Sequence, residues 1–194
     1  MQRIMMRLFL MAVLFFSMAV SAQATEIYNF DPMHTYVLWH VNHFGFSEQA
    51  GKFTMVDGTI TLDESKPQDS KVNVTIHTDD IATGIPKLDE HLKSGDFFNV
   101  TKYPTATFVS NKVQVTGKDT GKVYGLLTLV GVTRPVVLEV KLLKMGMHPM
   151  KNKKSLGFSA TTMIKRSDFG MKAYLPALGD DVQIEIGAEA NLAG

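Results

Sequence analysis

The stretch HTYVLWHVNHFGF, from His34 to Phe46, decides the fold class, because apolar residues in it alternate with other residues at a period of two. Val37, Trp39 and Val41 share one face, and the side chains between them share the other. Strict alternation of this kind is typical of a β-strand with one buried face. On that register His43 continues the apolar inner face, and Trp39 points into the interior.

The three histidines of this stretch raise the question of a metal site, since histidine is the commonest metal ligand. In a strand that rises about 3.3 Å per residue, His34 and His40 share the outward face but lie about 20 Å apart. His40 and His43 point to opposite faces. A shared ion would therefore require further ligands folded alongside, namely His77, His91 or His148. From this spacing we predict no metal ligand.

The same alternation recurs through the rest of the chain. In KVNVTIHTD, residues 71–79, Val72, Val74 and Ile76 lie on one face and polar residues lie on the other. Glycine, proline, asparagine and aspartate lie between most of these runs and indicate turns. Eight strands are predicted in this way, at residues 34–44, 52–62, 71–79, 105–114, 122–130, 134–145, 155–166 and 181–190.

One segment breaks the alternation. In IPKLDEHLKSGDFF, Ile85 to Phe98, the spacing of Leu88, His91 and Leu92 is that of one face of a helix. We predict a short amphipathic helix in the long connection between the third and fourth strands. Eight antiparallel strands with short loops in one domain indicate an all-β sandwich or an up-and-down barrel, and periodicity alone does not choose between them.

Residues 1–24 have the pattern of a secretory signal peptide. Arg3 and Arg7 give a basic start, Leu8–Val20 is an apolar run, and AQA has the small-x-small form of a cleavage site. The apolar run is too short to span a bilayer comfortably. We therefore expect cleavage after residue 24, a single domain at residues 25–194, and export to the periplasm.

Charge and cysteine content narrow the function classes. The two arginines are the only charged residues of the leader, so 18 of the 20 lysines and arginines remain, against 19 acidic residues. No basic excess exists to neutralise phosphates, so nucleic acid is not an expected partner. The chain has no cysteine, which fits a periplasmic domain held by its core better than a small disulfide-bonded scaffold.

Taken together, four stretches resemble the YceI family in their order along the chain. The resemblance covers Tyr28 to Glu189, which is nearly all of the sequence after the leader. It departs at Thr35, where the family pattern has serine, another small hydroxyl residue. The four stretches are DPMHTYVLWHVNHFGFSEQAGKF (31–53), DEHLKSGDFFNVTKYPTATF (89–108), GLLTLVGVTRPVVLEV (125–140) and LGFSATTMIKRSDFGM (156–171).

This resemblance implies an eight-stranded antiparallel, lipocalin-like β-barrel. The helical periodicity of residues 85–98 inside a strand-rich chain predicts that this segment covers one barrel end and helps to admit a ligand. An eight-stranded barrel either fills its interior with side chains or holds one ligand. The family implies an elongated apolar tunnel and an amphiphilic lipid with a long apolar tail, either a polyisoprenoid, an isoprenoid quinone or a fatty-acid derivative. No other cofactor is implied. Transient contact with a membrane or membrane protein, and homodimerisation, stay open as further partnerships.

Two groups of residues are candidates for contact with such a lipid. The candidates for the lumen are Val37, Trp39, Val41, His43, Phe44, Phe53, Val74, Ile76, Phe97, Phe98, Phe108, Leu127, Leu129, Phe158 and Phe169. The candidates for the mouth, where a head group would lie, are Asp89, His91, Arg134, Arg166 and Asp168. For a single phenylalanine an ordinary core role competes with ligand contact. For the two arginines, surface ion pairs with Asp168 or Glu139 compete with a phosphate or carboxylate.

Two other function classes remain as alternatives. An enzyme acting on a small apolar substrate would use His43, or His91 with Asp89, as general acid or base. Against it, the chain has no cysteine, no G-x-S-x-G, no H-E-x-x-H and no paired-carboxylate motif. A structural or stress-associated interaction protein would have a filled barrel. An open apolar interior would favour lipid binding over that third class.

Overall fold

The computed structural model describes residues 25–194, so the predicted signal peptide lies outside the described part of the chain. The described residues form ten strands, one short α-helix and three 3-10 turns. The strands are β1 (Glu26–Phe30), β2 (Tyr36–His43), β3 (Ser47–Phe53), β4 (Val56–Leu62), β5 (Lys71–His77), β6 (Thr105–Val115), β7 (Thr120–Leu129), β8 (Val132–Met147), β9 (Lys154–Lys165) and β10 (Leu178–Leu192). The helix is α1 (Pro86–Lys93), and the 3-10 turns are η1 (Pro67–Asp69), η2 (Thr78–Asp80) and η3 (Arg166–Phe169).

The ten strands make a closed antiparallel barrel with eight strand positions. The hydrogen-bonded order runs β1-β4-β5-β6-β7-β8-β9-β10, and β1 also pairs with β10, which closes the sheet. β1 and β2 lie end to end along β10, with Phe30 opposite Ala190 and Tyr36 opposite Gly187. β3 and β4 follow them in the same way, β3 on β2 and β4 on β1. The predicted eight-stranded barrel is therefore confirmed.

The strand predicted at residues 52–62 is broken in the structure, and β1 and most of β3 were absent from the prediction. The break follows Phe53, and a side chain satisfies the backbone there. The Asp80 carboxylate accepts hydrogen bonds from the backbone N–H of Thr54 at 2.6 Å and of Met55 at 2.7 Å. Burial alone would raise the pKa of Asp80, but these hydrogen bonds outweigh it and lower the pKa. Because Asp80 satisfies these two backbone donors, the barrel wall continues from β3 to β4 across the break.

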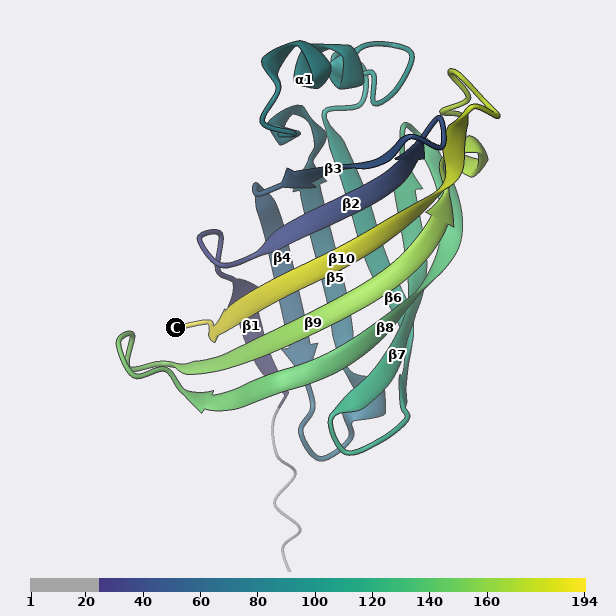
Figure 1. Ribbon diagram of the computed structural model, residues 1–194. Helices are drawn as coiled ribbons and strands as arrows, with labels where there is room; N and C mark the ends of the chain where they lie inside the picture. The colour runs from purple at the N-terminus through teal and green to yellow at the C-terminus, as the bar shows by residue number, and fades with distance from the viewer. Residues whose placement is uncertain (1–24) are drawn as a thin grey trace, which may run out of the picture.

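The barrel has two differently built ends, called upper and lower as they appear in Figure 1. Over the upper end lies α1, in the connection from β5 to β6 where a helix was predicted, although it ends at Lys93 rather than Phe98. The β4–β5 and β6–β7 connections form the lower end, which no α-helix of residues 25–194 covers (Figure 1). No helix in residues 25–194 is long and apolar enough to cross a membrane.

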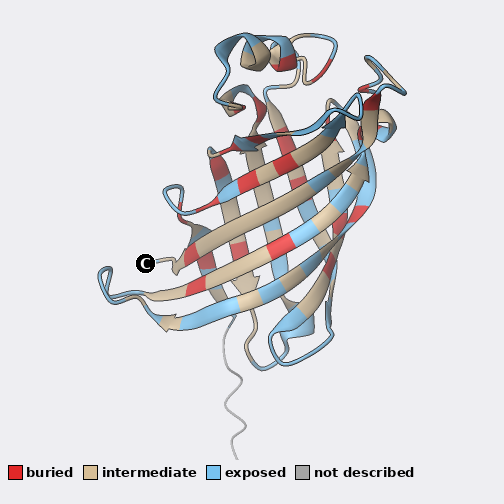
Figure 2. Cartoon of the chain, viewed as in Figure 1, coloured by how far each residue is buried: buried red, intermediate tan, exposed pale blue. Residues whose placement is uncertain are grey.

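Buried residues are interspersed with more exposed ones along the strands (Figure 2), as expected for strands with one inner and one outer face. Two glycines on inner faces make room for large aromatic rings. A Cβ atom on Gly51 would lie 2.3 Å from the Trp39 ring, and one on Gly125 would lie 2.4 Å from the Phe108 ring. Both aromatic side chains therefore depend on the absence of a side chain on a neighbouring strand.

Candidate functional site

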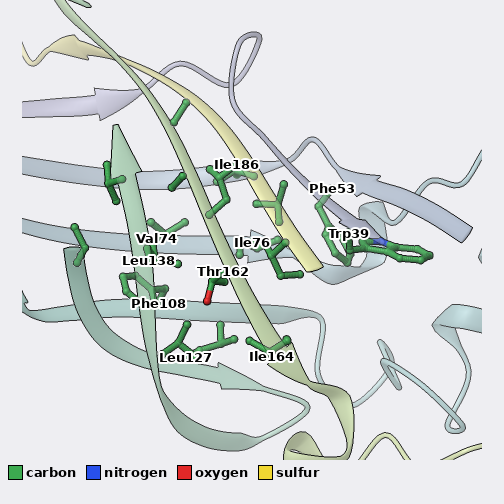
Figure 3. Close-up of a pocket in the computed structure, with 18 of the residues that line it drawn as sticks. Trp39, Phe53, Val74, Ile76, Phe108, Leu127, Leu138, Thr162, Ile164 and Ile186 are labelled. Atoms are coloured by element: carbon green, nitrogen blue, oxygen red, sulfur yellow. The ribbon is translucent and has the colours of Figure 1, made fainter. Parts of the chain in front are cut away.

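The barrel encloses a cavity of about 910 Å³. Its wall extends from Leu88 and Tyr174 at the upper end to Pro67 and Gly117 at the lower end, so it follows the whole length of the barrel. Between the ends the lining is mostly aliphatic and aromatic, and the hydroxyl of Thr162 is one of its few polar groups (Figure 3). The interior is therefore an elongated, mostly apolar cavity.

The structure places almost all of the lumen candidates on this cavity. They come from six different strands, from the β2–β3 turn and from the segment after α1, so the wall is assembled from the whole domain. Whether each one touches a ligand stays a prediction. The candidates that line the cavity are Val37, Trp39, Val41, His43, Phe44, Phe53, Val74, Ile76, Phe97, Phe98, Phe108, Leu127, Leu129 and Phe158.

Trp39 occupies a row of residues that crosses neighbouring strands on the inner face. Thr162 of β9 lies opposite Ile184 of β10, which lies opposite Trp39 of β2, which in turn lies opposite Gly51 of β3. Only 7% of Trp39 is exposed, and its indole N–H has no hydrogen-bond partner among the described residues. A buried donor without an acceptor is uncommon and costs stability.

Aromatic side chains from distant segments meet at the upper end. The ring of His91 on α1 lies 5.1 Å from that of Phe97 and 5.9 Å from that of Tyr174, edge to face in both cases. Phe97 and Tyr174 are stacked at 6.3 Å. All three residues line the cavity, so this aromatic cluster forms its upper boundary. His91 also lies 3.6 Å from the Asp96 carboxylate, outside the ring cluster.

Arg166 organises the loop that carries Tyr174. Arg166 is only 4% exposed, and its guanidinium donates hydrogen bonds of 2.7–3.0 Å to four backbone carbonyls. Burial lowers the pKa of Arg166, and the nearby Asp180 carboxylate partly offsets that effect. Arg166 lines the cavity, but its donors are largely engaged by the protein, which differs from the head-group role predicted for it. The acceptors are the carbonyls of Met171, Ala173, Leu178 and Gly179.

Phe169, Arg134 and Asp168 lie away from the cavity, contrary to the prediction. The pairing of β8 with β9 starts at Glu139 opposite Thr161, so the two strands are unpaired above that point. Phe169, which is 2% exposed, packs at this gap with apolar residues of the wall. Arg134 and Asp168 line a separate pocket of about 470 Å³ beside it. Alternation of apolar residues reports only the faces of strands. It could not reveal that the 3-10 turn η3 completes the wall at this point.

Asp89 is also not part of the mouth. Its carboxylate accepts hydrogen bonds from the backbone N–H of Thr83 at 2.7 Å and from the Thr83 hydroxyl at 2.6 Å. The side chain thereby fixes the turn that leads into α1. Since Asp89 does not line the cavity, it does not join His91 in an acid–base pair facing a substrate.

Charged side chains border the cavity at the lower end. The Lys154 ammonium donates to Glu26 at 2.6 Å and also pairs with Glu64, which lines the cavity. The Tyr28 hydroxyl donates to the same Glu26 carboxylate at 2.6 Å. Burial and this hydrogen bond raise the pKa of Tyr28 to about 12. Hydrogen bonds from Lys154 and Tyr28 lower the pKa of Glu26.

One histidine of the opening stretch belongs to a cluster with the ligand types of a metal site. Potential ligand atoms of Asp31, His34 and Glu189 lie within 4.8 Å of one another. The Lys151 ammonium already pairs with the Asp31 carboxylate, so a lysine supplies the positive charge that a metal ion would bring to this cluster. Burial would raise the pKa of Asp31, but Lys151 and other hydrogen-bond donors lower it. The geometry is that of an ion-pair network joining the 148–153 turn to the barrel wall.

Several residues on the cavity were absent from the sequence prediction. Tyr174 lies in an irregular loop, and Thr162 was inside a predicted strand but is polar. Leu88 lay in the predicted helix, and the helical periodicity could have identified it as a cavity residue. Met145 follows a shift in the pairing of β8 with β9, and such a shift leaves no mark in alternation.

Comparison with known proteins identifies the family of this barrel. The YceI-like domain matches residues 28–190. The chain belongs to the YceI family. It is 41% identical over 178 residues to the protein YceI of Shigella flexneri, with 92% of each chain covered.

Solved structures of the YceI fold agree with the barrel described above. The Campylobacter jejuni YceI protein is 32% identical and has a TM-score of 0.68, covering 74% of this chain and 85% of that one. A polyisoprenoid binding domain from Saccharophagus degradans has a TM-score of 0.67 at 14% identity, covering 86% of this chain and 98% of that one. At that identity the second likeness shows the fold alone.

Proposed function

We propose that the protein binds one amphiphilic lipid in the barrel, with its long apolar tail in the cavity and its head group at one end. The observation that carries this proposal is the apolar cavity of about 910 Å³. That volume lies at the upper end of the range usual for small-molecule sites. The tail would be a polyisoprenoid, the side chain of an isoprenoid quinone or a fatty-acid derivative. The naming of a YceI-fold relative as polyisoprenoid-binding supports the first of these.

The energetics of such a site need no specific polar contact with the tail. Burial of one methylene group contributes roughly 0.8 kcal/mol, so ten methylenes contribute about 8 kcal/mol before ordering costs. Selectivity then depends on the length and width of the cavity and on the chemistry at its ends. The lining supports this mode of binding, because polar groups lie mostly at the two ends.

A binding role fits the arrangement of titratable groups better than catalysis does. Asp89 is engaged with Thr83, and His91 faces Phe97 and Tyr174. His43 packs edge to face against Phe44 at 4.5 Å. General acid–base chemistry needs such groups to converge on a substrate within hydrogen-bond reach. An unfilled interior also favours binding over a purely structural barrel.

Mass spectrometry of organic extracts tests this proposal most directly. Protein purified from its native cell compartment should release one dominant lipid class in about equimolar amount. A matched control is the Val74→Asp/Ile76→Asp variant, which places charges on the cavity wall and should release little lipid. Wild-type protein without bound lipid, which also fails to take up an isoprenoid quinone or a long-chain fatty acid, would contradict the proposal.

We also infer that residues 1–24 direct export to the periplasm and are then removed. The basic start, the apolar run and the small residues before Thr25 support this inference. The secreted form should begin at Thr25 when its N-terminus is sequenced, and cell fractionation should place it in the periplasm. Retention of the leader in a cytoplasmic protein would contradict the inference.

A further inference from the structure

The hairpin formed by β8 and β9 projects beyond the rest of the barrel wall. β7 pairs with β8 only as far as Thr120 opposite Lys141. β8 continues to Met147, which lies opposite Lys154 of β9. The end of this β8–β9 hairpin therefore has no neighbouring strand on the β7 side, and Figure 1 shows it extending past the barrel.

The end of the hairpin, residues 141–154, is basic; it starts at Lys141, the last β8 residue that β7 pairs with. Its sequence KLLKMGMHPMKNKK contains five lysines and one histidine but no acidic residue. Lys151 pairs with Asp31, and Lys154 pairs with Glu26 and Glu64. The other three lysines are exposed and form no ion pair with the described residues; they are Lys141, Lys144 and Lys153. The segment thus presents a net positive charge to its surroundings.

Large apolar side chains are exposed between these lysines. Leu143 and Met147 are each 60% exposed, Met145 is 41% exposed, and Met150 at the tip is 90% exposed. Soluble domains seldom expose so many large apolar groups within one hairpin unless the surface binds something. Methionine is flexible and polarisable, which suits contact with an irregular apolar partner.

Hydrogen bonds hold the tip of the hairpin in one conformation. The His148 ring nitrogen Nδ1 accepts from the backbone N–H of Met150 and of Lys151, each at 3.2 Å. The backbone N–H of His148 donates to the Lys153 carbonyl at 2.8 Å, which closes the turn. The Lys151–Asp31 ion pair ties the turn to the barrel. Met150 is therefore presented by a preorganised turn.

The inner face of the projecting segment leads into the cavity. Leu142 and Met145 both line the cavity near its lower end. Met145 pairs with Leu156 and Met147 pairs with Lys154, so the two methionines lie on the same face of β8. An apolar path along β8 therefore connects the exposed tip with the interior of the barrel.

We propose that the 141–154 hairpin docks on the surface of an anionic lipid bilayer, and that it delivers or collects the bound lipid there. The positive charge complements anionic head groups, while Met147 and Met150 enter the interfacial region. A second copy of this chain is a poorer occupant, because two such hairpins would bring like charges together. Lipid transfer at this surface rests on the proposed function, whereas docking itself does not.

Vesicle flotation with the mature chain tests the docking. The vesicles contain 70% phosphatidylcholine and 30% phosphatidylglycerol, or phosphatidylcholine alone. The Lys141→Glu/Lys144→Glu/Lys153→Glu variant should lose about 100-fold in affinity for the anionic vesicles, at about fivefold for each lysine. Met147→Ser/Met150→Ser should lose about tenfold. Wild-type protein should bind pure phosphatidylcholine vesicles much more weakly.

A charge-matched control variant lies at the upper end. Lys87→Glu/Lys102→Glu/Lys172→Glu changes three exposed lysines by the same charge and should retain affinity within about threefold. Equal loss in both triple variants would overturn the proposal, as would equal binding to both kinds of vesicle. A hairpin-dependent dimer in light scattering, without vesicle binding, would overturn it in favour of a second copy.

Docking and lipid binding fail in different ways, so the two proposals are separable. The hairpin variants should retain equilibrium binding of an isoprenoid quinone added from solution, with slower transfer from vesicles. Vesicle binding by protein that never holds a lipid would leave the docking surface in place and contradict the proposed function. Loss of quinone binding in the charge-reversal variant would show that the hairpin is part of the binding site and overturn its assignment as a separate docking surface.

Discussion

The two ends of the barrel border the same cavity but are built from different chemistry. At the upper end, His91, Phe97 and Tyr174 pack against one another beneath α1. Arg166 holds the loop of Tyr174 through four backbone carbonyls. At the lower end, Glu64 and Lys154 form an ion-pair rim beside the projecting 141–154 hairpin. The upper end is organised by packed aromatic rings and the hydrogen bonds of the buried Arg166, and the lower end by partly exposed ion pairs.

This difference predicts a division of roles. Buried hydrogen bonds and packed rings contribute strongly to the free energy of unfolding, whereas ion pairs that stay in contact with water contribute less. We therefore expect substitutions at the upper end to act mainly on stability. Substitutions at the lower end should act mainly on exchange of the lipid with its surroundings.

The largest effect should come from Arg166→Met. Removing the guanidinium leaves buried backbone carbonyls without donors, so the free energy of unfolding should fall by at least about 3 kcal/mol. Urea unfolding followed by circular dichroism measures this change. Arg134→Met is the matched control, because Arg134 is exposed and, among residues 25–194, donates only to the Thr133 carbonyl. The control should stay within about 0.5 kcal/mol of wild type. Similar losses in the two variants would remove the distinction between a buried and a surface arginine.

A smaller loss is expected from Gly51→Ala, which tests the wall just below the upper end. The added Cβ would lie 2.3 Å from the Trp39 ring, so the indole must move. Overpacking of this kind costs about 1–3 kcal/mol. Because Trp39 is the chain's only tryptophan, its emission should shift as well.

Gly95→Ala serves as the control for that substitution, because a Cβ on Gly95 would meet no atom within 4 Å. It should leave both the unfolding transition and the emission spectrum unchanged. If Gly51→Ala behaves in the same way, the indole does not occupy the space above Gly51. An isoprenoid quinone added to wild-type protein should quench the same emission, since Trp39 lines the cavity.

Most of the barrel was predictable because alternation reports directly which face of a strand is buried. Val74 and Ile76 of β5 follow the rule and line the cavity. β1 was not predicted, because five residues are too few for the alternation to stand out. The break between β3 and β4 depends on Asp80, which is 25 residues or more away along the chain. Long-range hydrogen bonds of this kind leave no local signal.

The ends of the barrel were harder to predict than its wall. Arg166 was chosen as a head-group ligand because arginine often binds anions, yet carbonyls of its own loop engage its guanidinium. Tyr174 lies in an irregular loop, where no periodicity exists to interpret. The resemblance to the YceI family predicted the barrel and suggested the lipid ligand that we propose, but contacts between loops depend on tertiary structure alone.

Asp80→Asn should produce a loss similar to or smaller than that of Gly51→Ala, about 1–2 kcal/mol at neutral pH, because hydrogen bonds to a charged acceptor are weakened. The pKa of Asp80 is lowered in the folded state. Its contribution to stability is therefore present above about pH 3.9 and is lost as the pH falls through the lowered pKa. The variant should lack this part of the acid-unfolding profile. Asp79→Asn, at an exposed neighbouring position, should retain it. Parallel acid profiles for wild type and Asp80→Asn would contradict the role assigned to Asp80.

The smallest effect on stability should come from Lys154→Met at the lower end. The Lys154 side chain is 26% exposed, and pairs of this kind typically contribute less than about 1 kcal/mol. Hydrogen bonds to Glu26 and Glu64 raise the pKa of Lys154, so its contribution is present at neutral pH and is lost only as the pH rises through that raised pKa. Without the ammonium, Glu26 loses the largest of the influences that lower its pKa.

High salt separates this lower-end interaction from those at the upper end. The difference between wild type and Lys154→Met in the free energy of unfolding should shrink between 20 mM and about 1 M sodium chloride, where the screening length falls to about 3 Å. The loss in Arg166→Met should persist, because its hydrogen bonds are buried and screened much less. Lys153→Met, beside Lys154 but without an ion pair to the described residues, should show no difference from wild type at either salt concentration. A Lys154→Met loss above about 2 kcal/mol that is independent of salt would place the lower end in the same class as the upper one, and the proposed division between stability and exchange would fail.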